Sequence, residues 1–293
     1  MGGLELSQIL EFLAAPFVAS LILTGIHSYL GVHVVERGVI FVDLSLAQIA
    51  ALGAAIAILL PFTGGDPHAP SVYWVSLLFT FIGAAVFSMI RGKRARIPQE
   101  AIIGISYAVA SAAGILAMSK STSESEHLKH MLVGNIIAVS WREVGTTAAL
   151  YGAIGLFHYI FRKPFLAISM NHEGAEALGL NVRGWDFLFY ASFGFVVTSS
   201  VAIAGVLLVF CYLIVPSVAA MLFADTIGMR LAIGWIMGTV VSALGVFLSL
   251  ILDLPTGATI VCTFGVVLIL MAIVRMLMPR KAPSGGWATR LQP

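Results

Sequence analysis

A carboxylate stands at the start of a long apolar stretch in VDLSLAQIAALG, residues 42–53. This residue, Asp43, lies about one helical turn into a segment otherwise suited to lipid, where a carboxylate is costly and usually faces a cavity or a partner. Ala47, Ala50 and Ala54 follow it at helical spacing, so on a helix Asp43 begins a face of small residues. Such a face either lets neighbouring helices approach closely or leaves room for a solute.

The polar residues next to Asp43 lie elsewhere on the helix. Ser45 and Gln48 are on a face roughly 140–160° round from Asp43, at about 100° per residue. A carboxylate in the first turn of a helix is also favoured by the helix dipole, without any further role. Both interpretations of Asp43, as a functional carboxylate and as a dipole-favoured one, are compatible with the pattern.

The chain contains none of the common enzyme motifs. It has no GxxxxGK[ST] loop, so it cannot bind ATP in a P-loop by itself, and no HExxH, GxSxG or CxxC. His127 and His130 are explained by a wet outer loop, and His158 by an interior position among aromatic neighbours. Cys211 and Cys262 lie in separate apolar runs, which predicts buried free thiols rather than a disulfide or a metal pair.

Composition decides the class of protein. Of the 293 residues, 59% are hydrophobic and only 10% are charged, whereas soluble domains have roughly 25% charged residues. The mean hydropathy is +1.01. A chain of this length cannot hide so much apolar surface from water. We therefore predict an all-α, polytopic membrane protein with a single transmembrane domain over residues 1–293 and no removable signal peptide.

Nine apolar runs are long enough to cross a bilayer, which takes about 17–25 residues. The sixth and seventh runs are almost continuous, and only residues 202–205 can turn the chain between them. An eight-span arrangement, with 205–223 re-entrant or broken, is therefore the alternative. The predicted spans are 9–30, 41–61, 71–90, 101–118, 142–161, 186–204, 205–223, 231–251 and 257–277. The carboxylates at the starts of these spans are expected to be interface anchors, and they are Glu11, Glu100, Glu143 and Asp186.

The distribution of Lys and Arg favours nine spans. Cytoplasmic flanks collect basic residues, and nine spans with the N-terminus outside put 13 of the 16 Lys and Arg on the inside. If 205–223 were re-entrant, Arg230 and the four basic residues after it would move outside and the split would become even. The inside set is Arg37, Arg91, Lys93, Arg94, Arg96, Arg162, Lys163, Arg183, Arg230, Arg275, Arg280, Lys281 and Arg290, and the outside set is Lys120, Lys129 and Arg142.

Residues 162–184, RKPFLAISMNHEGAEALGLNVRG, form a predicted cytoplasmic segment between two spans. Asn171 can cap a short helix running through Glu173–Leu178, and Gly179 is placed to end it. A short capped helix that faces the cytoplasm is an element that a soluble partner protein can grip. Residues 278–293 are expected to form a cytoplasmic tail.

Five segments along the chain carry a resemblance to one known family. They are ERGVIFVDLSLAQIAALG, HLKHMLVGNIIAVS, NHEGAEALGLNV, VAIAGVLLVFCYLIVPSVAA and DLPTGATIV. In order, they are similar to a D-x-x-x-H stretch that runs on to a Gly, an outer L-x-G-N/D-I-L-x-V-S segment, a cytoplasmic coupling segment with A-x-x-x-G-[VL], and two late signatures, V-G-x-L-L-V-x-x-x-x-x-P and L-P-x-G-x-x-I-V. Together they resemble the metal-type permeases of bacterial ABC importers, which carry zinc, manganese or chelated iron.

The resemblance implies a fold, a function and partners. The chain would be the permease subunit of an ATP-driven importer in the bacterial inner membrane, with a divalent metal ion as cargo, no covalently bound cofactor and no enzymatic activity of its own. Its partners would be a second copy of itself, two ATP-binding subunits and an extracytoplasmic metal-binding protein, and no nucleic acid. The residues that match the ATPase-coupling segment are Glu173, Ala175, Leu178 and Gly179, and those of the late signatures are Gly205, Pro216, Pro255 and Gly257.

The resemblance implies a pathway that is lined near its outer mouth by an Asp and by a His four residues later. Asp43 matches the Asp and is the predicted metal residue, with Ala47, Gln48 and Ala50 lining the pathway, but Ala47 stands where the family has His. Metal sites for zinc or manganese use imidazole or several oxygens, and Gln48 lies on another face. Two alternatives stay open. One is the same architecture carrying a chelated metal or a small organic solute, and the other is a secondary transporter in which Asp43 binds a proton or sodium.

Overall fold

The computed structural model describes residues 6–63, 69–90, 97–119, 134 and 136–278. This part of the chain is helical and has no strand, which confirms the predicted all-α class. The long helices are α1 (Leu6–Arg37), α2 (Val42–Leu59), α3 (Pro70–Ile90), α4 (Gln99–Met118), α6 (Trp141–Ile160), α9 (Val182–Met221), α10 (Ile227–Leu252) and α11 (Thr256–Leu277). The short elements are η1 (Pro61–Thr63), η2 (Ile136–Ala138), α7 (Arg162–Met170) and α8 (His172–Ala177).

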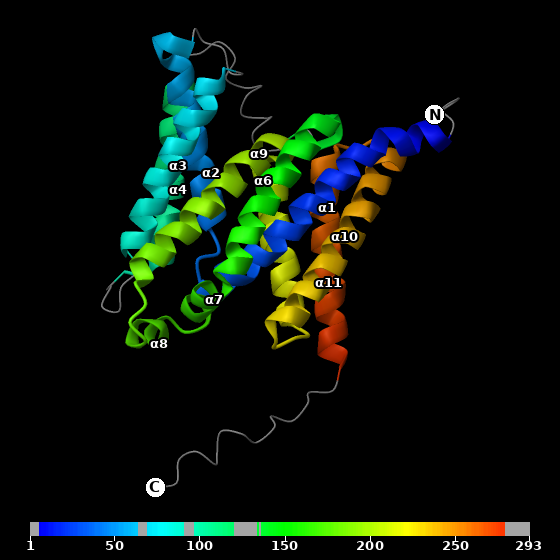
Figure 1. Ribbon diagram of the computed structural model, residues 1–293. Helices are drawn as coiled ribbons and strands as arrows, with labels where there is room; N and C mark the ends of the chain where they lie inside the picture. Colours follow the sequence, from blue (N-terminus) through cyan, green and yellow to red (C-terminus); the bar gives the residue numbers. More distant parts are fainter. Residues whose placement is uncertain (1–5, 64–68, 91–96, 120–133, 135, 279–293) are drawn as a thin grey trace.

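Among the described helices, seven are long and apolar enough to cross a membrane, and α6 with α7, bent by 75°, adds an eighth if the pair is one span. Helix α9 has 40 residues. At 1.5 Å per residue its two arms together measure about 60 Å, roughly twice the thickness of the hydrocarbon core. In Figure 1 its first arm leads from α8 to the opposite end of the molecule, and its second arm returns to the start of α10. The predicted count of about nine therefore holds when the two arms of α9 are counted separately.

Gly205 divides α9 into these two arms. Its φ of 75° and ψ of 160° are not helical, and only Gly adopts a positive φ without strain. Gly134 lies against the break, because a Cβ added at Gly134 would overlap the backbone of Ala204 and Gly205. Pro216 lies in the second arm. The chain therefore bends within residues 202–205, as the sequence predicts.

Helix α1 connects the two groups of helices that carry the predicted sites. It contacts α6, α7, α9 and α10, while α2 packs against α3 and α4 and joins the rest through α9 (Figure 1). Gly31 permits a very close approach of α1 to the second arm of α9, because a Cβ at this position would overlap the carbonyl group of Leu213. The C-terminal end of α1 leads directly to α2 and also contacts α7, which precedes α8.

Basic residues lie at several of the described helix ends. Helix α1 begins at one end of the molecule, and it ends at the other, where α7 and α8 lie and α11 ends (Figure 1). These helix ends carry Arg37, Arg162 and Arg275. The predicted inner residues 91–96 and the outer Lys120 and Lys129 lie outside the described part of the chain. These three basic helix ends gather on one side, whereas Arg142, predicted to be outside, lies in the first turn of α6 at the end away from α7. This is the distribution expected from the positive-inside rule, and the orientation itself stays a prediction.

Two details differ from the sequence predictions. The first helix is longer than the predicted span 9–30, because its C-terminal turns remain buried within the bundle instead of ending at the membrane surface. Both cysteines are free, but Cys262 is exposed on the helical surface and Cys211 is only partly buried, so the prediction of a buried thiol is wrong for Cys262. The predicted tail 278–293 lies outside the described residues except for Met278.

Candidate functional site

Asp43 lies in the first turn of α2 and is almost completely buried. The whole residue is 2% exposed, and its Oδ1 atom has no hydrogen-bond partner among the described residues. Phe41 occupies the N-cap position, and no side chain caps the helix there. A buried polar atom without a partner is unfavourable unless a ligand, an ion or water completes it. The position in the first turn is still compatible with the helix-dipole explanation. The buried Oδ1 atom without a hydrogen-bond partner is the feature that indicates a further role for Asp43.

The start of α2 is held in place by two other helices. The Phe41 N–H donates to Glu100 Oε1 at the start of α4, at 3.0 Å. The ring of Phe41 stacks on that of Phe210 in the second arm of α9, with centroids 6.5 Å apart and planes within 6°. Glu100, predicted as an interface anchor, thus accepts a hydrogen bond from the residue that begins α2. The backbone that begins α2 therefore contacts both α4 and α9.

The face of small residues below Asp43 is used at least partly for helix packing. Ala47 and Ala50 are 2% and 5% exposed, and Gln48 is 7% exposed. Ser76 Oγ of α3 donates to the carbonyl of Ala50 at 2.8 Å. Close approach of helices, one of the two readings of this pattern, therefore applies at Ala50. The pathway-lining role of Ala47, Gln48 and Ala50 stays a prediction.

The described residues offer no complete set of metal ligands within one chain. No three His, Cys, Asp or Glu residues in this part of the protein are grouped closely enough to hold an ion. His158 is an interior residue as predicted, with its Nε2 2.8 Å from Ser192 Oγ and 1% of its surface exposed. His127 and His130 lie outside the described residues. Asp43 therefore belongs to no group of three such ligands among the described residues. The Glu100 carboxylate and the Cys211 thiol of the same chain are close enough to interact with it electrostatically.

The predicted capped helix is present as α8. Asn171 Oδ1 accepts from the Gly174 N–H at 2.9 Å and caps its start. Gly179 has a φ of +78°, and the N–H groups of residues 179 and 180 close the end on the carbonyls of Glu176 and Ala175, at 2.9 and 3.2 Å. These two bonds form a Schellman motif. The helix begins and ends one residue earlier than predicted, at His172 and Ala177.

Helix α8 is attached by one face and exposed on the other. Ala175 is 2% exposed and packs with Ile168 and Val182 in a small apolar cluster, whereas Leu178 is 81% exposed. Glu173 is also exposed. An exposed apolar side chain beside a carboxylate, at the basic end of the molecule, has the character of a protein contact surface. The coupling role of Glu173, Ala175, Leu178 and Gly179 stays a prediction.

A buried polar network that the sequence does not reveal lies beside this segment. Arg37 Nε donates to Ser169 Oγ at 2.8 Å, and Arg37 Nη1 donates to Asp186 Oδ1 at 2.5 Å. His33 Nδ1 lies 2.8 Å from the same Ser169 hydroxyl. Asp186 was expected at the membrane interface, but its side chain is 1% exposed and paired with a guanidinium that is 0% exposed. The partners are 132 and 149 residues apart in sequence, so no local pattern reveals them.

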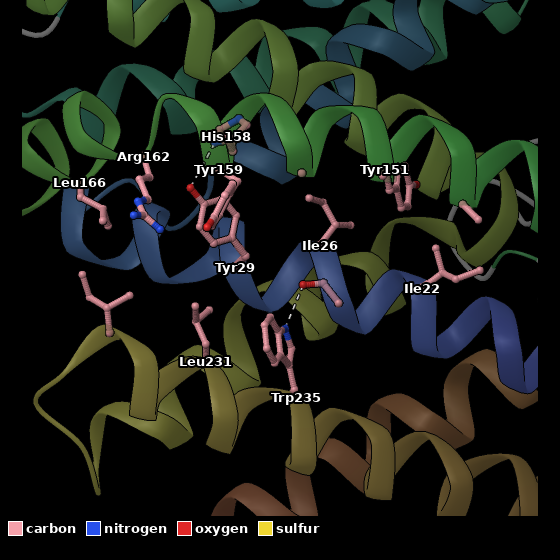
Figure 2. Close-up of a pocket in the computed structure, with 15 residues that line it drawn as sticks. Ile22, Ile26, Tyr29, Tyr151, His158, Tyr159, Arg162, Leu166, Leu231 and Trp235 are labelled. Carbon is pink, nitrogen blue, oxygen red and sulfur yellow. Dashed lines mark hydrogen bonds between the residues drawn. The ribbon is translucent and has the colours of Figure 1, made fainter.

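A cavity of about 560 Å³ lies between α1, α6, α7 and α10. Figure 2 shows Tyr29 and His158 on one side of it and Trp235 on another, where Trp235 Nε1 donates to the Gly25 carbonyl at 3.0 Å. The lining is mainly apolar, and Asp43 is not part of it. This cavity therefore has neither the carboxylates nor the position expected for the Asp43 pathway.

A model of the ABC 3 transport family matches residues 9–275. The chain belongs to this family. It is 26% identical over 257 residues to the "Manganese transport system membrane protein MntC" of Listeria innocua, covering 85% of this chain and 86% of the relative. It is 24% identical over 264 residues to a "Probable iron transport system membrane protein" of Haemophilus influenzae, covering 90% of each chain. The solved structure "PsaBC from Streptococcus pneumoniae in complex with Fab" matches with a TM-score of 0.71 and 24% identity, over 89% of this chain and 90% of that one.

Family membership and the apolar helices establish a multi-pass permease subunit of the bacterial inner membrane. The resemblance seen in the five sequence segments is therefore confirmed. Two of these segments meet in the structure, since Gly134 of the outer segment lies against Gly205 of the first late signature. In the second late signature, Pro255 is the N-cap residue of α11, and Gly257 is buried in its first turn. These residues shape helix ends and breaks rather than present chemical groups.

Proposed function

We propose that this permease imports a divalent metal ion, with manganese as the first candidate and iron as the second. The observation that carries the proposal is the buried carboxylate of Asp43, whose Oδ1 has no hydrogen-bond partner among the described residues. Relatives along most of the chain are named for manganese and iron transport. A carboxylate is a suitable oxygen ligand for manganese, which also accepts carbonyl and water ligands.

The proposed assembly contains further chains. This chain has no P-loop, so ATP would be hydrolysed on two separate ATP-binding subunits that dock on the exposed face of α8. A second copy of the permease would complete the pathway, because the described residues of one chain offer no group of three ligands around Asp43. An extracytoplasmic metal-binding protein would deliver the cargo to the opposite end of the molecule.

A second cargo class is favoured by one specific observation. Ala47 stands where the family pathway has His, so the chain lacks the imidazole that would bind a bare ion firmly. A chelated metal, or a small organic solute, needs fewer protein ligands. The ion-gradient alternative is less well supported, because the chain belongs to the ABC 3 transport family.

The test is manganese uptake by the complex purified with its ATP-hydrolysing partner and reconstituted into liposomes. Asp43→Asn keeps the size of the side chain but removes the charge that attracts a divalent cation. We expect uptake per folded permease to fall at least about tenfold, which corresponds to about 1.4 kcal/mol. The matched control is Asp225→Asn, which changes an exposed carboxylate in the link between α9 and α10 and should transport normally.

Three outcomes separate the possibilities. Wild-type uptake of manganese that Asp43→Asn abolishes supports the proposed site. Uptake by Asp43→Asn equal to wild type, per folded molecule, returns Asp43 to the helix-dipole explanation. Uptake of a manganese chelate but not of the free ion by the wild-type complex would favour the second cargo class.

A further inference from the structure

One side chain holds both ends of the segment that contains α8. Arg37 is the last residue of α1, and its Nε donates to Ser169 Oγ in α7 at 2.8 Å. Its Nη1 donates to Asp186 Oδ1 in α9 at 2.5 Å. Ser169 precedes α8 and Asp186 follows it, so the guanidinium bridges the two ends of residues 169–186.

This bridge is buried and geometrically specific. The side chains of Arg37 and Asp186 are 0% and 1% exposed, and Arg37 Cζ lies 3.9 Å from the centroid of the Phe189 ring. The Ser169 hydroxyl is also 2.8 Å from His33 Nδ1. A guanidinium is planar and carries several donors in fixed directions, so it can contact a hydroxyl and a carboxylate at once. A displacement of either end of the α8 segment must therefore move Arg37 or break one of these bonds.

The connection continues from Arg37 to the start of α2. Gly38, with a φ of +67°, and Val39 donate their N–H groups to carbonyls of α1 at 3.0 and 3.2 Å, which closes the helix. The Val42 N–H then donates to the Val39 carbonyl at 3.1 Å, and both Val side chains are buried. The link between Arg37 and Asp43 is short and hydrogen-bonded, although Ile40 and Phe41 within it are exposed. A short link held by hydrogen bonds has little slack to absorb a movement of Arg37.

From this geometry we infer that Arg37 is a positioning residue that couples movements of the α8 segment to the backbone that carries Asp43. The inference rests on the proposed function, in which an ATP-binding subunit docks on α8 and Asp43 lies in the pathway. Arg37 touches neither cargo nor nucleotide in this scheme. It makes the position of α2 depend on the position of α8 through two contacts that a simple packing residue does not provide.

The experiment compares uptake with ATP hydrolysis in the reconstituted complex, using radiolabelled manganese. Arg37→Lys keeps the charge opposite Asp186 but removes the fork that reaches Ser169 as well. Ser169→Ala keeps the ion pair and removes the shared hydroxyl, so it tests the bridge even if Arg37→Lys fails to fold. For both variants we expect manganese transported per ATP hydrolysed to fall about fivefold or more, the lower end of typical coupling between sites, while the ATPase rate per complex is retained.

The neighbouring ion pair offers a matched control. Glu36, one residue before Arg37, pairs with Arg230 of α10, and these side chains are 22% and 13% exposed. Glu36→Gln therefore weakens an ion pair at the same end of α1 that joins α10 rather than the α8 segment. The ratio of manganese to ATP should stay at the wild-type value in this variant.

The possible results distinguish a coupling role of Arg37 from a purely structural one. A lowered ratio in Ser169→Ala or Arg37→Lys, with a normal ratio in Glu36→Gln, supports the coupling role. Uptake and ATPase activity that decline together, in proportion to folded protein, would show that the bridge only stabilises the fold and would overturn the inference. If the wild type shows ATP-driven uptake and the ratio is unchanged in both variants, the inference alone is overturned. If the wild type shows no ATP-driven uptake, the proposed function is overturned and the inference with it.

Discussion

Replacing Gly179 with Ala tests whether the shape of α8 matters for transport. Gly179 has a φ of +78°, and a Cβ added there meets nothing within 4 Å. The cost is therefore conformational strain without a steric clash, about 1–2 kcal/mol for an L residue in the left-handed region. A change of this size should raise local opening of the helix end roughly 5- to 30-fold. Because α8 has only six residues and is largely exposed, the strain should appear as local opening rather than global unfolding.

Two measurements on the full complex check this reasoning. Native-state hydrogen exchange reports the amides of positions 179 and 180, whose bonds to Glu176 and Ala175 close α8. These amides should exchange faster in Gly179→Ala, while the exchange of α9 stays unchanged. Manganese transported per ATP hydrolysed should fall in the same variant, since a docking subunit would meet a frayed helix. Gly179→Asn is the matched control, because Asn adopts the left-handed conformation more readily and should resemble the wild type in both measurements.

The result can refute either half of the argument. Unchanged exchange in Gly179→Ala would mean that the strain is relieved by a movement of the segment and that the energetic reasoning is wrong. Faster exchange with a wild-type ratio of manganese to ATP would mean that the end of α8 is not part of the docking surface. An equal loss in Gly179→Asn and Gly179→Ala would show that any side chain at this position obstructs the partner, which the open space around Gly179 does not predict.

Two further predictions follow from backbone strain and ligand chemistry. Gly205→Ala should lower the thermal midpoint in detergent by several degrees, at about 2–4 °C per kcal/mol of strain, because φ is 75° there. Gly152→Ala, whose added Cβ has nothing within 4 Å, should leave the midpoint nearly unchanged, and equal shifts in the two variants would contradict the strain at Gly205. Ala47→His should raise zinc uptake relative to manganese in competition assays, since imidazole is a good zinc ligand. The same rise in the Asp43→Asn background would show that position 47 does not act together with Asp43.

Features that depend on neighbouring residues are predictable from the sequence. The cap at Asn171 and the end at Gly179 need only a few adjacent residues, and the structure has both. The bend at Gly205 also follows from a local choice, because only a residue without a side chain adopts its φ freely. The helical class follows from hydropathy, which is a summed property of long segments and tolerates errors at single residues.

Features that depend on distant partners are not predictable in this way. Asp186 has the sequence environment of an interface residue, yet the fold places it against Arg37 from another helix, 149 residues away. Arg37 itself counted only as one of many basic flanking residues. Ser169 carries no motif at all, and its importance comes from the two side chains of α1 that meet at its hydroxyl. A single sequence does not show which side chains of distant helices come into contact.

The face of small residues on α2 shows a different limit of prediction from sequence. Ala50 was placed on the pathway because small residues leave room for a solute, but the same residues allow close helix packing. The hydrogen bond from Ser76 to the Ala50 carbonyl shows that α3 occupies part of this face. The spacing of residues identified the face, and only the fold could show what lies against it.

The departure at Ala47 bears directly on the identity of the cargo. Ala47 is 2% exposed and offers no ligand atom, and Gln48 lies on another face of α2, so the chain brings carboxylate oxygen but no imidazole to this turn. Zinc sites are usually built from nitrogen and sulfur with few oxygens, whereas manganese accepts carboxylate, carbonyl and water ligands. An ion bound at Asp43 would therefore keep much of its water or share a second carboxylate, from Glu100 or from a second copy. A partly hydrated ion held by carboxylates is bound weakly enough to be released on the other side, which a transport pathway requires and a storage site does not. On this ground manganese ranks ahead of zinc as the proposed cargo. The ranking follows from the oxygen ligand of Asp43, because this chain lacks the imidazole of the family's Asp and His pair.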